Sequence, residues 1–124
     1  MEHIGPLTDA PDVVGFSIEL DPLASQWLET HPMHSRIVIT FSVTRCCGGT
    51  PVRDVRLRVD EPVAARRRGR FVRIGRVADR DVLMDARVLK TMPRRIPITV
   101  HRLLGRQRLS LDLSGDQWGR LLYS

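Results

Sequence analysis

Cysteine is scarce in this chain of 124 residues, and the two that are present, Cys46 and Cys47, are adjacent. Two cysteines are too few for a disulfide framework, and neighbours bridge only through a strained vicinal ring. Free thiols in a reducing compartment are therefore the simpler interpretation. A signal peptide is also lacking, since Glu2 and Asp9 stand near the start in place of a basic region followed by an apolar segment. The sequence thus predicts a cytoplasmic protein.

Long apolar runs are absent as well. The longest uncharged run, residues 37–44, contains polar side chains and is far too short to cross a bilayer. This argues against a membrane protein. The hydrophobic share of 42% and the charged share of 27% are typical of a soluble globular chain, and the length fits one domain.

Motifs of common enzyme classes are missing too. The chain has no glycine-rich phosphate loop, no H-E-x-x-H, no G-x-S-x-G and no C-x-x-C. A nucleophile pair formed by Cys46 and His101 has no supporting motif, although such partners meet only in the folded chain. The sequence therefore predicts a protein that is not an enzyme.

Lysine is nearly absent, because nineteen of the twenty basic residues are arginine, and the net charge of +6 is unevenly spread. Residues 1–35 hold six acids and no Lys or Arg, whereas residues 36–108 hold nineteen bases and six acids. Such a basic segment attracts nucleic acid or an acidic partner. However, its only aromatic residues are Phe41 and Phe71, and proteins that bind single strands stack bases on aromatic rings. Nucleic-acid binding is therefore not expected.

The densest cluster of positive charge is an arginine run in the connection over residues 60–70. We interpret it either as a solvated loop or as a docking patch for an acidic protein partner. The candidate patch consists of Arg66, Arg67, Arg68 and Arg70.

The stretch 36–59 organises the predicted fold as a strand, a tight turn and a second strand. Ile37, Ile39, Phe41 and Val43 alternate with smaller or polar residues, and Val55, Leu57 and Val59 alternate with Arg56 and Arg58. The second strand therefore has one cationic face. Gly48, Gly49 and Pro51 reverse the chain between the strands, which places both thiols in or beside a loop.

The remaining elements follow from local signals, after an irregular surface segment at residues 1–15. A short strand over 16–20 precedes a helix that begins at Asp21 and Pro22 and ends near His31. Later patterns predict strands over 71–77, with a bulge at Gly75, and over 82–84, followed by a helical turn capped by Asp85. Residues 96–100 and 109–113 form a hairpin whose first strand should lie at a sheet edge because it contains Pro97. The tail, 114–124, should form a short helix or strand.

Three side chains in these elements are interpreted as structural. Trp27 continues the apolar stripe of the helix and is expected to anchor the core. His31 and His34 flank the helix end, where solvation is favoured over metal binding because no third ligand is near in sequence.

The order of these elements resembles that of the HesB/IscA-like family, the A-type iron–sulfur carriers. Residues 18–21 with Ala24 resemble the I-x-L-T/S start of the family and its first helix. Arg45-Cys46-Cys47-Gly48 resembles its G-C-S-G turn, residues 83–85 its hydrophobic-V-D step, and residues 96–113 its following hairpin. The resemblance implies an α+β, mostly β, compact sandwich or barrel with one N-terminal helix and short later helical turns. The implied domain spans residues 16–113, with 1–15 before it and the tail 114–124 packed on it or on another subunit.

The same resemblance implies a non-enzymatic carrier that binds iron or an iron–sulfur cluster through Cys46 and Cys47, across a homodimer. The chain departs from the family where the C-terminal C-x-C pair should follow an N-P turn, because Ser114-Gly115 replaces the turn and no cysteine follows. Two alternatives therefore stay open. One is a degenerate relative that acts as a protein-interaction module through its arginine-rich face. The other is a redox site in which Arg45 lowers a thiol pKa and the two thiols form a vicinal disulfide.

Overall fold

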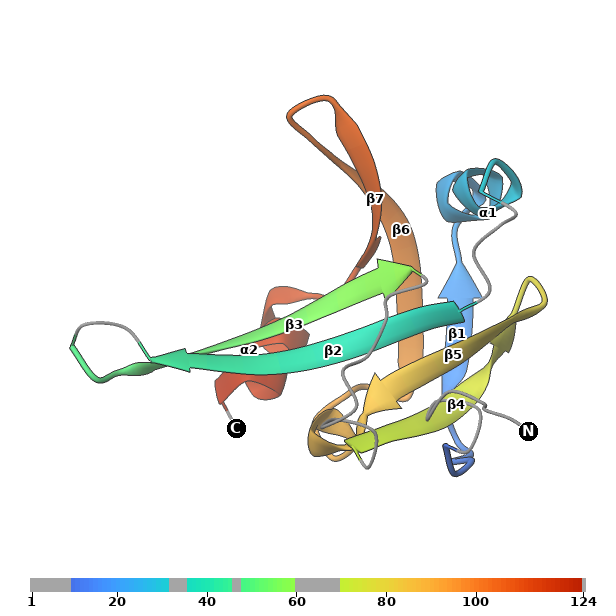
Figure 1. Cartoon of the computed structure of the whole chain (residues 1–124). Coiled ribbons are helices and arrows are strands. Elements are labelled where there is room, and N and C mark those ends of the chain that lie inside the picture. Colours follow the sequence, from blue (N-terminus) through green and yellow to red (C-terminus); the bar gives the residue numbers. More distant parts are fainter. Residues whose placement is uncertain (1–9, 32–35, 46–47, 60–69, 124) are drawn as a thin grey trace, which may run out of the picture.

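The computed structural model describes residues 10–31, 36–45, 48–59 and 70–123, which form seven strands, two α-helices and one short 3₁₀ helix (Figure 1). The first half contains β1 (Ser17–Leu20), α1 (Pro22–Glu29), β2 (Arg36–Arg45) and β3 (Pro51–Val59). The second half contains β4 (Phe71–Val77), β5 (Arg80–Asp85), η3 (Ala86–Val88), β6 (Arg95–Leu103), β7 (Arg106–Leu111) and α2 (Gly115–Tyr123). The expectation of an α+β, mostly β chain is confirmed.

The strands form two sheets. One has the order β3-β2-β5-β4, in which β2 pairs antiparallel with β3 and parallel with β5. The other has the order β1-β6-β7, in which β1 pairs parallel with β6. The predicted hairpins β2–β3 and β6–β7 are confirmed. The finer HesB/IscA-like assignment stays a prediction.

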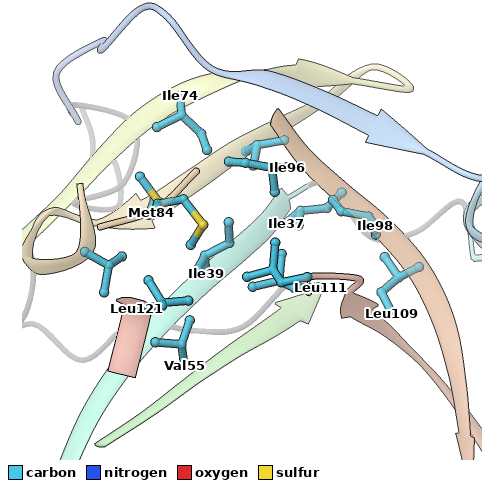
Figure 2. Close-up of a cluster of buried hydrophobic side chains, with 14 of the residues drawn as sticks. Ile37, Ile39, Val55, Ile74, Met84, Ile96, Ile98, Leu109, Leu111 and Leu121 are labelled. Atoms are coloured by element: carbon cyan, nitrogen blue, oxygen red, sulfur yellow. The ribbon is translucent and has the colours of Figure 1, made fainter. Parts of the chain in front are cut away.

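Side chains from both sheets and from α2 point toward one another in a common core (Figure 2). Burial of this apolar surface is the main force that holds the two sheets together. The contributing residues include Ile37, Ile39, Val55, Ile74 and Met84 from the first sheet, Ile96, Ile98, Leu109 and Leu111 from the second, and Leu121 from α2.

Strand β2 is an inner strand of its sheet, and the first half of the strand is buried on both faces. Ile37 and Ile39 face the common core, whereas Val38 points to a second cluster with Ala10 and Phe71. The residues before β1 were expected to be irregular and to lie on the surface. Their described part is irregular, but Ala10 is buried in that second cluster, and Asp12 pairs with Arg73 of β4.

The local signals for helix starts and bulges are also confirmed. Asp21 caps α1 and accepts a hydrogen bond from the backbone N–H of Ala24 at 2.8 Å, with Pro22 in the first turn. Asp85 caps η3 in the same way through the N–H of Arg87. The register of β4 against β5 shifts between Arg73 and Gly75, as expected for a bulge.

The prediction that the strand containing Pro97 lies at a sheet edge is wrong. Strand β6 is the middle strand of its sheet. Proline is tolerated there because the β6–β7 register begins only at Ile98, opposite Leu111. At Pro97 itself the carbonyl oxygen accepts a hydrogen bond from the N–H of Asp112 at 2.9 Å. The position therefore uses the acceptor that proline retains rather than the donor that it lacks.

Candidate functional site

The predicted thiol site lies at the far end of the β2–β3 hairpin. The ladder continues to the last pair, Arg45 opposite Pro51, and the side chains around these strand ends are exposed. Figure 1 shows this hairpin extending away from the body of the molecule. Cys46 and Cys47 lie outside the described residues. The described structure thus fixes the two paired strand ends that the Cys-Cys-Gly-Gly-Thr segment joins.

Metal ligands beyond those thiols are not gathered in the described part of the chain, where no three His, Cys, Asp or Glu side chains form a group able to hold an ion. His101 is exposed on β6. His31 stacks on Trp27 with ring centroids 3.7 Å apart, and its Nδ1 donates to the carbonyl oxygen of Trp27 at 2.7 Å. Neither of these two histidines therefore belongs to a group of three ligands among the described residues, and His34 lies outside them.

The predicted arginine patch is described only at its end. Arg70 is exposed immediately before β4, whereas Arg66, Arg67 and Arg68 lie outside the described residues. A docking role for this patch stays a prediction.

A second candidate site, which the sequence did not indicate, is a groove between β3 and β7. Two adjoining hollows of about 260 and 280 Å³ share the lining residues Arg56, Leu57, Arg108 and Leu109. The first hollow also contacts Trp27 of α1, and the second also contacts Trp118 of α2. We call the two hollows together the β3–β7 groove. Each hollow has a tryptophan in its lining.

The β3–β7 groove combines apolar and cationic lining. Leu109 is buried and Leu57 partly buried, so both belong to the core side of the groove, whereas Arg56 and Arg108 are exposed. Arg58 lines the first hollow as well. No Asp or Glu occurs among the described lining residues, although Asp54 pairs with Arg56 from the same strand. The cationic face predicted for β3 is thus part of a basic hollow.

Sequence reasoning missed this groove because its tryptophans lie far from its arginines in the chain. Trp27 belongs to the acidic segment 1–35 and Trp118 to the tail. Neither lies in the basic segment 36–108, whose aromatic residues were considered for nucleic-acid binding. Both are half-buried and pack against the core, which agrees with the anchor role expected for Trp27. Only the folded chain brings them to the same surface as Arg56 and Arg108.

Two carboxylates outside these candidate sites, Asp85 and Asp21, form hydrogen bonds within the fold. Asp85 is almost fully buried, and Arg87 donates to both of its oxygens, at 3.0 and 2.7 Å, which raises the pKa of Arg87. A third hydrogen bond from the Arg87 guanidinium reaches the carbonyl oxygen of Phe41 on β2. The hydroxyl of Thr99, followed by the backbone N–H of Ala24, lowers the pKa of Asp21. Both carboxylates are helix caps, Asp21 of α1 and Asp85 of η3.

Comparisons with protein-family models, with curated proteins and with solved structures found no significant match. In the described part of the chain, neither helix has the length and apolar character needed to cross a membrane.

Proposed function

We propose that the protein is a carrier-like, non-enzymatic module that binds iron or an iron–sulfur cluster through Cys46 and Cys47. The observation that carries the proposal is the β2–β3 ladder, which remains paired up to Arg45 and Pro51 while the strand ends are exposed. A paired hairpin restricts the backbone on both sides of the two thiols at an accessible end of the molecule. Thiolates are the usual ligands of cluster iron.

The element order adds support. A strand, a capped helix, a long hairpin interrupted by the cysteines, a strand ending at Asp85 and a last hairpin follow one another as in the HesB/IscA-like resemblance. Two thiols are fewer than the four thiolates that commonly hold a cluster, and the described residues contain no group of three ligands of their own. The proposal therefore includes a homodimer in which each copy contributes its cysteine pair.

The test is anaerobic purification and reconstitution with iron and sulfide, followed by iron and sulfide analysis, an absorption spectrum and a measurement of oligomeric mass. We expect wild-type protein to take up metal as a dimer and Cys46→Ser to lose it. Thr50→Ala is the matched control, since this exposed residue belongs to the same segment between the strands. Equal and negligible metal in wild type and Cys46→Ser would exclude the carrier function.

A vicinal-thiol redox site is the second candidate, because the two thiols are adjacent in the sequence and disulfide chemistry needs only two thiols. A low-molecular-weight disulfide such as oxidised glutathione would be reduced to two thiols as Cys46 and Cys47 lose two hydrogens and form one S–S bond. Mass spectrometry after mild oxidation should then show loss of two hydrogens within one peptide. Two independently alkylated thiols after the same treatment would contradict this candidate.

A further inference from the structure

The β3–β7 groove lies between two outer strands. In the sheets formed by the described residues, β3 is the last strand of one sheet and β7 the last strand of the other, and the two strands are in contact. The outer edge of a strand presents backbone N–H and C=O groups that an extended chain can pair with. The hollows along these two strands are therefore a place where an extended segment can lie.

The positive charge of the groove favours a bound segment that carries carboxylate side chains. Arg56, Arg58 and Arg108 line it, and no described lining residue is acidic, although Arg56 already pairs with Asp54 of its own strand. Arg108 makes no ion pair within the described ranges, and it lies opposite His101 in the β6–β7 register, so no carboxylate faces it across the hairpin. A ligand with carboxylates at alternate positions places them at these guanidinium groups, which bind carboxylates in bidentate fashion.

The apolar lining of the groove favours apolar side chains on the other face of the bound segment. Leu57 and Leu109 line both hollows and continue into the common core. In an extended chain, successive side chains point to opposite sides. Apolar residues between the carboxylates would therefore face the two leucines while the carboxylates reach the arginine rim.

Single-stranded nucleic acid fits the groove less well. One face of the Trp27 ring is covered by the imidazole of His31, which lies 3.7 Å away and within 13° of parallel. Trp118 is half-buried against the core. Nucleic-acid grooves of this type need open aromatic faces on which bases stack. Here each tryptophan serves as an apolar wall of its own hollow.

We propose that the β3–β7 groove binds an extended, acidic segment of a partner protein in which carboxylate side chains alternate with apolar ones. The carboxylates pair with Arg56, Arg58 and Arg108, and the apolar side chains cover Leu57 and Leu109. This site shares no residue with the Cys46–Cys47 segment, so the two functions can be lost separately.

The chain carries its own reporter for this proposal, because its only two tryptophans line the groove. We would titrate the reduced full-length protein with an alternating Glu-Leu peptide of about eight residues, and follow tryptophan emission. An alternating Lys-Leu peptide of equal length and a single-stranded oligothymidine are the comparison probes. The Glu-Leu peptide should change the emission saturably, and the Lys-Leu peptide should not. Raising sodium chloride from about 0.1 M to about 0.5 M should weaken this binding.

Charge reversal locates the site. Arg108→Glu should weaken binding of the Glu-Leu peptide by about tenfold or more, since it replaces an attraction with a repulsion. Arg120→Glu is the matched control, because this exposed residue of α2 lies outside the groove lining and changes the net charge equally. Arg108→Gln, with circular dichroism of each variant, separates lost binding from lost folding. It should weaken binding by a smaller factor.

Three results would overturn the proposal: no saturable response to the Glu-Leu peptide, tighter binding of oligothymidine than of the peptide, or equal weakening by Arg108→Glu and Arg120→Glu. The variant Cys46→Ser should bind the peptide as the wild type does. Its behaviour separates failure of the groove proposal from failure of the carrier proposal.

Discussion

At the scale of single residues, Asp21 joins two elements that are far apart in the sequence. Its carboxylate caps α1 through the N–H of Ala24 and also accepts the hydroxyl hydrogen bond of Thr99 on β6. Its own backbone N–H donates to the carbonyl oxygen of Ile98 at 3.0 Å. The sequence predicts the cap from the Asp-Pro pair, but the bond to Thr99 depends on the parallel pairing of β1 with β6, which no local signal reveals.

The first prediction concerns this carboxylate and pH. Because the Thr99 hydroxyl lowers the pKa of Asp21 in the folded state, the carboxylate stabilises the fold above its ordinary pKa of 3.8. That contribution is lost as the pH falls through the lowered folded pKa. Thr99→Val should reduce the free energy of unfolding by about 1 kcal/mol near pH 7, because it removes one partly exposed hydrogen bond.

Urea unfolding of the wild type, Thr99→Val and Asp21→Asn at several pH values measures this effect. Both variants should differ most from the wild type near neutrality and converge with it in strong acid. Asp112→Asn is the control, since the Asp112 side chain is exposed. A stability difference that stays constant from neutral to strongly acidic pH would show that the charge of Asp21 is irrelevant to the cap.

The second prediction concerns the β6–β7 turn. Leu104 and Gly105 have φ values of +53° and +78°, and they are the two residues that connect the strands, so the turn requires left-handed backbone at both positions. Glycine adopts this conformation without cost, whereas leucine does not. The Leu104 side chain is 95% exposed and gains no burial in return.

Leu104→Asn should therefore raise the free energy of unfolding by about 1 kcal/mol, because asparagine tolerates this conformation. Thermal and urea unfolding provide the measurement. Leu103→Asn is the control, since Leu103 is also exposed but belongs to the strand, and it should give no stabilisation. If Leu104→Asn destabilised the protein, the leucine would have to make a contact that the described fold lacks.

At the scale of elements, α1 is fastened at its C-terminal end by a buried cation. Arg80, at the start of β5, is only 9% exposed and donates to the carbonyl oxygens of Leu28 and His31 at 3.0 and 3.1 Å. It also donates to the carbonyl oxygen of Ala78 in the β4–β5 turn. The last carbonyls of a helix lack partners within the helix, and a cation there also interacts favourably with the helix dipole.

The third prediction follows from these contacts. Arg80→Met keeps much of the side-chain volume but leaves the carbonyl groups of Leu28 and His31 without this donor, so the free energy of unfolding should fall by about 3 kcal/mol. Arg76→Met is the control, because that side chain is 63% exposed on the same hairpin and should cost less than about 1 kcal/mol. Hydrogen exchange should show faster opening at the end of α1 in Arg80→Met. Equal losses in the two variants would contradict a fastening role for Arg80.

At the scale of the whole molecule, the sequence reveals the elements better than their partners. Alternating apolar residues and helix caps are local signals, and they place all seven strands and α1 to within a few residues of their bounds. Local signals do not reveal that β4 and β5 form a hairpin, because the turn between them uses Ala78 and Asp79, both at positive φ, in place of glycine. The central position of β6 escapes it because one proline signals an edge strand.

The candidate sites divide in the same way. The cysteine pair and the arginine run are contiguous in sequence and can be found there, whereas the β3–β7 groove cannot. Its lining comes from α1, β3, β7 and α2, and only pairing between distant strands brings these elements together. The cationic face of β3 is the one part of the groove that sequence periodicity predicts, since Arg56 and Arg58 alternate with apolar residues.

The extent of the folded domain leads to the fourth prediction. The family resemblance implies a domain over residues 16–113 with the tail packed on it or on another subunit, and Leu121 of α2 is 3% exposed and belongs to the same core as Ile39 and Val55. A side chain buried to this degree contributes as a core residue does. Leu121→Ala should therefore lower the free energy of unfolding by about 3 kcal/mol, through lost burial and the cavity that remains.

Urea unfolding in a Trp27→Phe background, followed by tryptophan emission and by circular dichroism, tests this expectation, because Trp118 alone then reports on α2 and the far-ultraviolet signal reports on the whole fold. The two probes should give one coincident transition, shifted to lower urea in Leu121→Ala. Tyr123→Ala is the matched control, since Tyr123 belongs to the same helix but is 83% exposed. If the two variants unfolded alike, or if Trp118 changed before the rest of the chain, α2 would be an appendage. The cooperatively folding domain would then end near residue 113.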